Sequence, residues 1–307
     1  MLRRTVALSS LWIAVLFVFA TGVVHAQSDG KRRSPDPDFG LQEARTLAVN
    51  GTELTYVDRG KGTPIVLVHG QASDFRVWQP LIEEASKQYR VIAYSRRYFF
   101  PNPSSRTLPQ SVEAADTRDL IAFIEALGVK PVHLVGHSAG GHAALIVTIE
   151  RPDLVRSLVL AEGGFLQAPG GATSNPGAAA SRKARALLEA GQDEEAVRTF
   201  VDATSGAGAF DRMPEVDRQR YLDNRMALGV PLSPPPSCER VRAVAIPVMI
   251  VEGDSSLPFL RAAMKTLGDC LPSAQRVTIP NASHGMFLDN PQAFNSAVLR
   301  FIAGNDR

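Results

Sequence analysis

A short stretch near the middle of the chain constrains the fold more than any other. Residues 132–135 form a mostly apolar run of strand length, and residues 143–149 form a small, helix-compatible segment. Between them, residues 136–140 read Gly-His-Ser-Ala-Gly and match the pattern G-x-S-x-G. At a sharp turn from a strand into a helix, only residues without a large Cβ substituent fit two positions before and two after the central residue. The stretch therefore predicts a strained turn that exposes the hydroxyl of Ser138.

An ordinary glycine-rich turn, such as one that holds a phosphate, is the alternative for this stretch. The context favours a nucleophile, because a strand precedes the turn, a helix follows it, and the Lys-Ser or Lys-Thr ending of a P-loop is missing. In such a turn the N–H of Ala139 and the helix N-terminus point at one spot, where negative charge developing on a substrate oxygen is stabilised.

The composition is that of an ordinary globular enzyme. The chain has 307 residues, of which 45% are hydrophobic and 21% charged, so it is long enough to bury a large core. The formal net charge is +2, and the one basic run lies at residues 31–33. Neither observation indicates a nucleic-acid partner.

Residues 1–26 have the layout of a secretory signal peptide. Two arginines precede an apolar run at residues 11–20, and Val-His-Ala at residues 24–26 is a small-residue pattern suited to cleavage. An uncleaved membrane anchor is the alternative, but the run is short for a span. We therefore expect a periplasmic or secreted protein that does not contact the membrane after cleavage. Residues 27–43 are rich in polar residues, Pro and Gly, which predicts a flexible linker.

Strand-like and helix-like segments alternate through most of the remaining chain. This alternation predicts an α/β fold with a mostly parallel eight-stranded sheet and helices on both faces. Asn50-Gly51 predicts a hairpin at its start. The core spans residues 44–164 and 241–307, and the pattern breaks between them. We interpret residues 165–240 as an inserted helical cap rather than a decoration without a role over the site, because they follow the strand beside the nucleophile.

Two cysteines, Cys238 and Cys270, remain after the predicted cleavage. An exported protein can pair them in a disulfide, and two separate thiols are the alternative. They lack metal-ligand spacing, so neither a metal nor an organic cofactor is implied.

The order of these elements resembles the α/β-hydrolase superfamily over nearly all of residues 44–304. The resemblance rests on His69-Gly70 after the third strand, on the G-x-S-x-G turn, on an acid-bearing loop after a later strand, and on Ser-His-Gly at residues 283–285 after the last strand. It implies a capped hydrolase of esters or lactones, with a small-molecule substrate.

The resemblance also assigns the catalytic groups. A Ser hydroxyl is a weak nucleophile without a nearby base. Ser138 is the expected nucleophile, and His284 lies in the short loop where the family has its base. The backbone N–H groups of Ala139 and Gln71 are the expected oxyanion hole. We interpret His69, His137 and His142, together with His133 inside a strand, as structural residues.

The position of the third catalytic residue, a carboxylate, is open. In most relatives it follows the seventh strand in a pattern like Gly-x-x-Asp, but here that position is Ser256, and Asp254 stands two residues early. Some relatives, certain lactone hydrolases among them, look similar to this chain in having a Glu after the sixth strand, which is Glu162 here. The task of the catalytic carboxylate is to hold one tautomer of the histidine. We favour Glu162 over Asp254, with Glu252 as a distant third.

Arg96 and Arg97 replace the usual Gly-bearing turn after the fourth strand. They either face the pocket and bind a carboxylate or phenolate, or are solvated or ion-paired at the end of the sheet, which is the commoner outcome.

These residues predict a serine hydrolase that cleaves a carboxylic ester or lactone through an acyl-serine intermediate. Epoxide hydrolases and dehalogenases share the fold but need an Asp where this chain has Ser138. A carbon–carbon bond hydrolase with the same triad is an alternative. A non-catalytic binding protein would explain Ser256, but it does not explain an intact Ser138 and His284.

Overall fold

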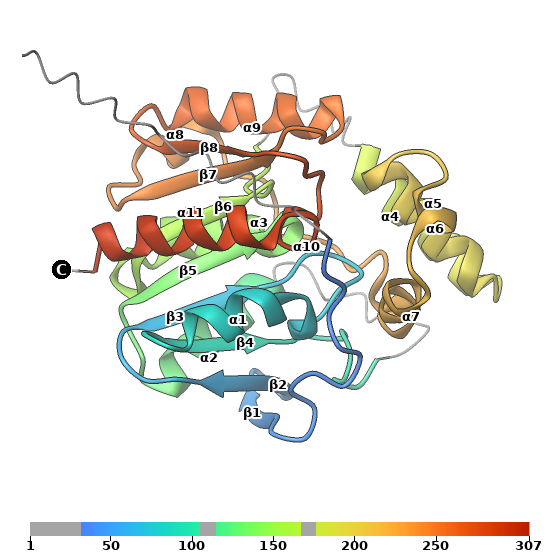
Figure 1. The fold of residues 1–307 in the computed structure, drawn as a ribbon, viewed down its shortest axis with the longest axis horizontal. Helices are drawn as coiled ribbons and strands as arrows, with labels where there is room; N and C mark the ends of the chain where they lie inside the picture. Colours follow the sequence, from blue (N-terminus) through green and yellow to red (C-terminus); the bar gives the residue numbers. More distant parts are fainter. Residues whose placement is uncertain (1–31, 105–114, 167–175, 307) are drawn as a thin grey trace, which may run out of the picture.

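The sheet is the organising element of the protein, a computed structural model of which describes residues 32–104, 115–166 and 176–306. Its eight strands lie in the order β1-β2-β4-β3-β5-β6-β7-β8 (Figure 1). β2 pairs antiparallel with β1 and β4, and all other neighbours are parallel. The predicted fold class is confirmed. The strands are β1 Arg45–Val49, β2 Thr52–Arg59, β3 Pro64–Val68, β4 Arg90–Tyr94, β5 Val132–His137, β6 Val155–Ala161, β7 Val248–Gly253 and β8 Gln275–Ile279.

Helices cover both faces of this sheet, and each face has its own hydrophobic core. Side chains alternate along a strand, so Ile65 and Leu67 of β3 pack on one face and Val66 and Val68 on the other. The first face is covered by η1 Phe75–Trp78, α1 Gln79–Ala85, α10 Met286–Asp289 and α11 Pro291–Gly304. The second is covered by α2 Ala115–Leu127, α3 Ser138–Glu150, α8 Cys238–Arg242 and α9 Pro258–Cys270, while η2 Pro152–Leu154 leads into β6.

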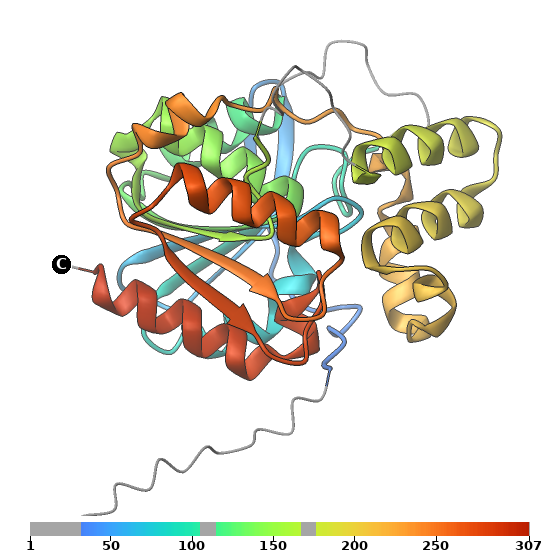
Figure 2. The same cartoon turned by 90° about the horizontal axis from the view of Figure 1, so that it is seen from above.

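An inserted helical cap separates β6 from β7 in the sequence. Figures 1 and 2 both show its helices beside one end of the sheet. The cap has a hydrophobic cluster of its own, in which Leu188, Val197 and Phe210 are buried. Ala72, in the loop after β3, joins that cluster and so connects the core to the cap. The cap elements are α4 Pro176–Glu189, α5 Asp193–Ser205, α6 Ala209–Arg212, α7 Glu215–Asp223 and η4 Arg225–Ala227.

The described part of the predicted linker, residues 32–43, differs from a flexible segment. Phe39 is 6% exposed and belongs to the core cluster of the first face. The N–H of Arg33 donates to the carbonyl of Leu288 at 2.8 Å, and that of Asp36 donates to the side chain of Gln79 at 2.7 Å. One large apolar side chain in a polar stretch is enough to fix it, because burial of a Phe is favourable by about 2 kcal/mol. The predicted signal peptide lies outside the described residues. Among the described helices, none has the length and apolarity needed to cross a membrane.

Cys238 and Cys270 form a disulfide that joins the start of α8 to the end of α9. The two residues are 32 positions apart in the sequence. The bond therefore closes a loop that contains β7, which lies between β6 and the edge strand β8.

We expect replacement of both cysteines by alanine to lower the free energy of unfolding by about 3 kcal/mol, because the cross-link restricts the unfolded chain. Urea unfolding of the two proteins measures this difference. The control is the parent protein in a strong reductant, which should unfold like the double variant. Superimposable curves for parent and variant would contradict the expected contribution.

Candidate active site

The loops that carry the expected catalytic residues all follow parallel strands at the same edge of the sheet. Ser138 follows β5, Glu162 follows β6, and His284 lies beyond the end of β8. The carboxyl ends of parallel strands meet at one edge, which is where open α/β sheets bind their ligands. The fold therefore brings these residues together although they lie far apart in the sequence.

Ser138 lies at a strained turn between β5 and α3. Its φ angle is +50°, a left-handed conformation that is uncommon for a residue with a Cβ atom. The flanking glycines are required by close backbone contacts. A Cβ on Gly136 would lie 2.5 Å from the Cα of Gly141, and one on Gly140 would lie 2.3 Å from the carbonyl oxygen of His69. The turn has the features of the nucleophile elbow that the sequence pattern predicts.

The structure places Glu162 against His284. The Oε2 atom of Glu162 accepts a hydrogen bond from Nδ1 of His284 at 2.6 Å. Glu162 is fully buried, and its φ angle of +44° is a second left-handed conformation at a residue other than glycine. Strained backbone of this kind is concentrated at functional sites, where the surroundings hold it in place.

The second carboxylate oxygen of Glu162 is held by the end of β7 and the loop that follows it. Its Oε1 atom accepts a hydrogen bond from the N–H of Gly253 at 2.9 Å and another from the hydroxyl of Ser256. Burial raises the pKa of the Glu162 carboxyl, but the interactions with His284, Ser256 and Gly253 outweigh burial and leave the pKa below its usual value. The carboxylate is therefore ionised at neutral pH. Ser256, at the position where most relatives have the acid, here supports a carboxylate that comes from another strand.

Asp254 makes no hydrogen bond to His284. It instead anchors the loop between β8 and His284. Its carboxylate accepts hydrogen bonds from the backbone N–H groups of Asn281 and Ala282, at 2.9 and 3.2 Å. The Asn281 bond is the main reason why the pKa of Asp254 is lowered. Glu252, at the end of β7, pairs instead with Arg276. Of the three carboxylates weighed from the sequence, only Glu162 has the geometry of a partner for the histidine.

Ser138 and His284 line one pocket of about 230 Å³ between the core and the cap. No hydrogen bond joins the Ser138 hydroxyl to His284 within the described structure. Such contacts are often long without substrate and tighten when it binds. The N–H of Gln71 makes no hydrogen bond within the described ranges, and the N–H of Ala139 lies in the first turn of α3, where N–H groups have no partner within the helix. The side chain of Gln71 is turned toward the cap, where its amide donates to the carbonyl of Ala227 at 2.7 Å.

Two further histidines support the site, and sequence reasoning recognised only part of their role. His69 donates from Nδ1 to the carbonyl of Gly70 at 2.8 Å, and its Nε2 accepts from the N–H of Arg96 at 2.9 Å. His137 donates from Nε2 to the main-chain carbonyl of His284 at 2.9 Å, with ring centroids 4.5 Å apart. His137 therefore holds the backbone of the expected base, a contact that no pattern in the sequence indicates.

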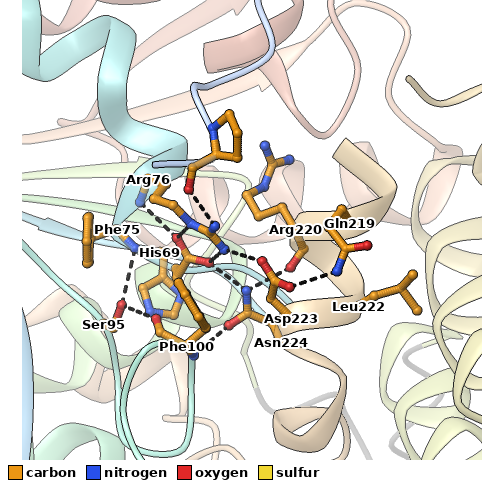
Figure 3. Close-up of polar contacts among 12 residues, drawn as sticks. His69, Phe75, Arg76, Ser95, Phe100, Gln219, Arg220, Leu222, Asp223 and Asn224 are labelled. Carbon is orange, nitrogen blue, oxygen red and sulfur yellow. Dashed lines mark hydrogen bonds and ion pairs between the residues drawn. The ribbon is translucent and has the colours of Figure 1, made fainter. Parts of the chain in front are cut away.

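A buried polar network connects the segment after the oxyanion loop to the cap (Figure 3). Arg76 donates to both oxygens of Asp74, at 2.9 and 2.7 Å, and to Asp223 at the end of α7, at 2.9 Å. Asn224 donates to Asp74 at 2.6 Å and accepts from the N–H of Phe100 at 2.9 Å. Because Asp74 and Arg76 are almost fully buried, this network fixes the foot of the cap beside the site.

The cap side of the pocket was not predicted residue by residue. Phe200, Met213 and Tyr221 contribute apolar surface, and Arg212 and Arg220 contribute charge. The core and the N-terminal segment complete the wall, the latter through Arg32, whose neighbourhood looked like a linker in the sequence.

The adjacent arginines after β4 turn away from this pocket. Arg97 makes two hydrogen bonds to the carboxylate of Asp119, at 2.6 and 2.8 Å. Arg96 is buried, with Asp116 at 3.5 Å. The structure thus shows the ion-paired alternative for both residues. Within the described ranges, no group of three His, Cys, Asp or Glu side chains is placed to hold a metal ion.

A sequence model of the alpha/beta hydrolase family matches residues 65–297. The chain belongs to this family. Serine hydrolase BPHL of Mus musculus is 27% identical over 83% of this chain and 85% of its own length. The 2-hydroxy-6-oxo-6-(2'-aminophenyl)hexa-2,4-dienoic acid hydrolase of Metapseudomonas resinovorans is 25% identical over 84% of this chain and 90% of its own. The solved structure of esterase RhEst1 from Rhodococcus sp. ECU1013 aligns with a TM-score of 0.70 at 22% identity, covering 85% of this chain and 99% of that chain, and so shows a shared fold.

We expect Glu162→Gln to lower kcat by about 10²–10⁴, because an amide cannot hold the same tautomer of His284 or stabilise its charged form. Steady-state hydrolysis of short p-nitrophenyl esters measures the effect. Asp254→Asn is the matched control, with kcat expected to stay within a few-fold of the parent protein. Loss of activity in Asp254→Asn and not in Glu162→Gln would reverse the assignment.

Buried neutral histidine makes stability sensitive to acid. Burial, with the nearby Arg96 charge, lowers the pKa of His69 to about 3. The unfolded chain, with an ordinary histidine pKa near 6.5, binds one more proton than the folded protein between these values. The free energy of unfolding should therefore fall as the pH drops below about 6.5, by about 1.4 kcal/mol per pH unit for this residue. Urea unfolding between about pH 7 and pH 5 should give a shallower pH dependence for His69→Gln than for the parent, and equal slopes would refute this origin.

Proposed function

We propose that this protein is a serine hydrolase that cleaves a carboxylic ester or lactone through an acyl-serine intermediate. The observation that supports it most is the hydrogen bond of His284 to the buried Glu162 carboxylate in the pocket that Ser138 lines. An imidazole held in this way presents its Nε2 atom as an acceptor, which is the form that a general base requires.

In the proposed mechanism the Ser138 hydroxyl oxygen attacks the ester carbonyl carbon while Nε2 of His284 takes its proton. The negative charge on the substrate oxygen is stabilised by the N–H groups of Gln71 and Ala139. Glu162 stabilises the imidazolium through Nδ1. His284 then gives the proton to the leaving alcohol oxygen, and an acyl group remains on Ser138. Water, deprotonated by His284, attacks this acyl group, and collapse of the second intermediate releases the acid and returns the proton to Ser138.

Carbon–carbon bond hydrolysis with the same residues is the second candidate, favoured by the similarity to the Metapseudomonas resinovorans enzyme. In that reaction the leaving atom is carbon, so the dienol substrate must first tautomerise to its keto form, which places a proton on that carbon before the bond breaks. Parallel assays with esters and with a vinylogous 1,5-diketone acid distinguish the two reactions, because a carbon–carbon bond hydrolase should turn over the diketone acid and an ester hydrolase should not.

We also propose that the protein is exported to the periplasm or beyond the cell. The proposal is supported by the signal-like sequence of residues 1–26 and by the disulfide between Cys238 and Cys270, since such bonds persist in oxidising compartments.

We expect a fluorophosphonate probe to label the native protein once per chain and to leave Ser138→Ala unlabelled. Intact-protein mass spectrometry measures the added mass, and ester hydrolysis by Ser138→Ala should fall by at least about 10³. Ser283→Ala, which changes another hydroxyl in the same pocket, is the control and should still be labelled. Labelling that persists in Ser138→Ala would refute the assigned nucleophile, and a protein that neither reacts nor turns over any ester would favour the binding-protein alternative.

A further inference from the structure

The charges around the pocket are not balanced. Three arginines line it, Arg32, Arg212 and Arg220, and no Asp or Glu lines it among the described residues. Two carboxylates lie beside this lining. Asp217 forms ion pairs with Arg32 and Arg220, at 3.0 and 2.9 Å, and Asp289 pairs with Arg32. These two charges offset those of Arg32 and Arg220, so the positive charge of Arg212 is left without a counterpart.

Arg212 is free because the acids near it are engaged elsewhere. Its neighbour Asp211 pairs with Arg198 on α5. The two oxygens of Asp202 accept hydrogen bonds from the backbone N–H groups of Gly208 and Phe210, at 3.1 and 2.9 Å. Within the ranges that the structure describes, Arg212 itself makes no ion pair.

The Arg212 side chain folds back along the pocket rim. A Cβ atom on Gly208 would lie only 2.8 Å from its Nη1 atom, so the guanidinium occupies the space that a side chain at this position would fill. The φ angle of Gly208 is +71°, which also favours glycine. The guanidinium therefore lies beside Gly208 in the pocket lining, and because Arg212 is exposed to solvent, it is hydrated when no ligand is bound.

We propose that the substrate of this pocket carries a carboxylate in addition to its ester or lactone group, and that Arg212 binds that carboxylate. The proposal rests on the function proposed above for Ser138 and His284. A guanidinium binds a carboxylate through two parallel hydrogen bonds, and an unpaired one gains this interaction without first losing another partner. Phe200 and Met213 line the same pocket, so the body that joins the two groups is apolar or aromatic.

Matched pairs of esters test this proposal. The first pair is 4-acetoxybenzoate and its methyl ester, which have the carboxylate or its neutral equivalent on the leaving alcohol. The second pair is the 4-nitrophenyl hemiester of adipic acid and 4-nitrophenyl hexanoate, which have it on the acyl group. The pair that shows the preference also reveals which side of the scissile bond points toward α6.

The parent protein should prefer the carboxylate-bearing member of one pair in kcat/KM. Arg212→Gln should remove that preference by raising KM about tenfold for the anionic ester alone. Arg218→Gln removes the same charge from α7, outside the pocket lining, and should leave both esters unaffected. An ionic strength of about 1 M should weaken the preference in the parent protein and in Arg218→Gln.

A binding measurement keeps this test independent of turnover. In the Ser138→Ala background, calorimetric titration with the intact esters should show tighter binding of the carboxylate, and added Arg212→Gln should abolish the difference. Equal effects of Arg212→Gln on both members of each pair would overturn the proposal, as would equal binding of both members by the parent pocket. If neutral and anionic esters bind as proposed but none is hydrolysed, the proposed function fails while the carboxylate site stands.

Discussion

A buried carboxylate that needs three donors is the interaction on which the rest of the site depends. Glu162 has no exposed surface, and an ionised carboxylate in such a place is costly unless it is paired and hydrogen-bonded. The donors are His284 in the loop after β8, Gly253 at the end of β7, and Ser256 in the loop that follows β7. The carboxylate thus fixes the segments after β6, β7 and β8 relative to one another at the sheet edge. These contacts set the orientation of the His284 imidazole.

The two residues with strained backbone in the site are held in place by the elements next to them. Ser138 and Glu162 both have left-handed backbone, which costs of order 1–3 kcal/mol at each residue. The two residues follow adjacent parallel strands, whose ladders and buried faces hold the positions before them rigid. His137 completes the support from the same turn, because its ring donates to the main chain of His284. The elbow therefore positions the expected base as well as the expected nucleophile.

The sequence predicted what local patterns determine and missed what depends on distance. The alternation of strands and helices and the turn at Ser138 follow from runs of apolar residues and from glycine spacing, and the role of the His284 loop follows from the resemblance to the family. The sequence favoured Glu162 over Asp254 as the partner of His284 but could not decide between them. Both residues follow buried strands, and only the geometry of the loops shows which carboxylate reaches the histidine. Arg32 gave no signal at all, because a basic residue in a polar stretch looks the same whether it is solvated or paired with Asp217 and Asp289.

The contacts of Arg32 have a consequence for the order in which the protein can assemble. Its two partners lie 185 and 257 positions later in the sequence. During synthesis the N-terminal part of a chain emerges first, and contacts of high sequence separation are the slow ones to form. The parallel strands before the cap can therefore pair while this wall of the pocket is still open. The pocket reaches its final shape only after the last helices have been made, so the site is completed at the end of folding.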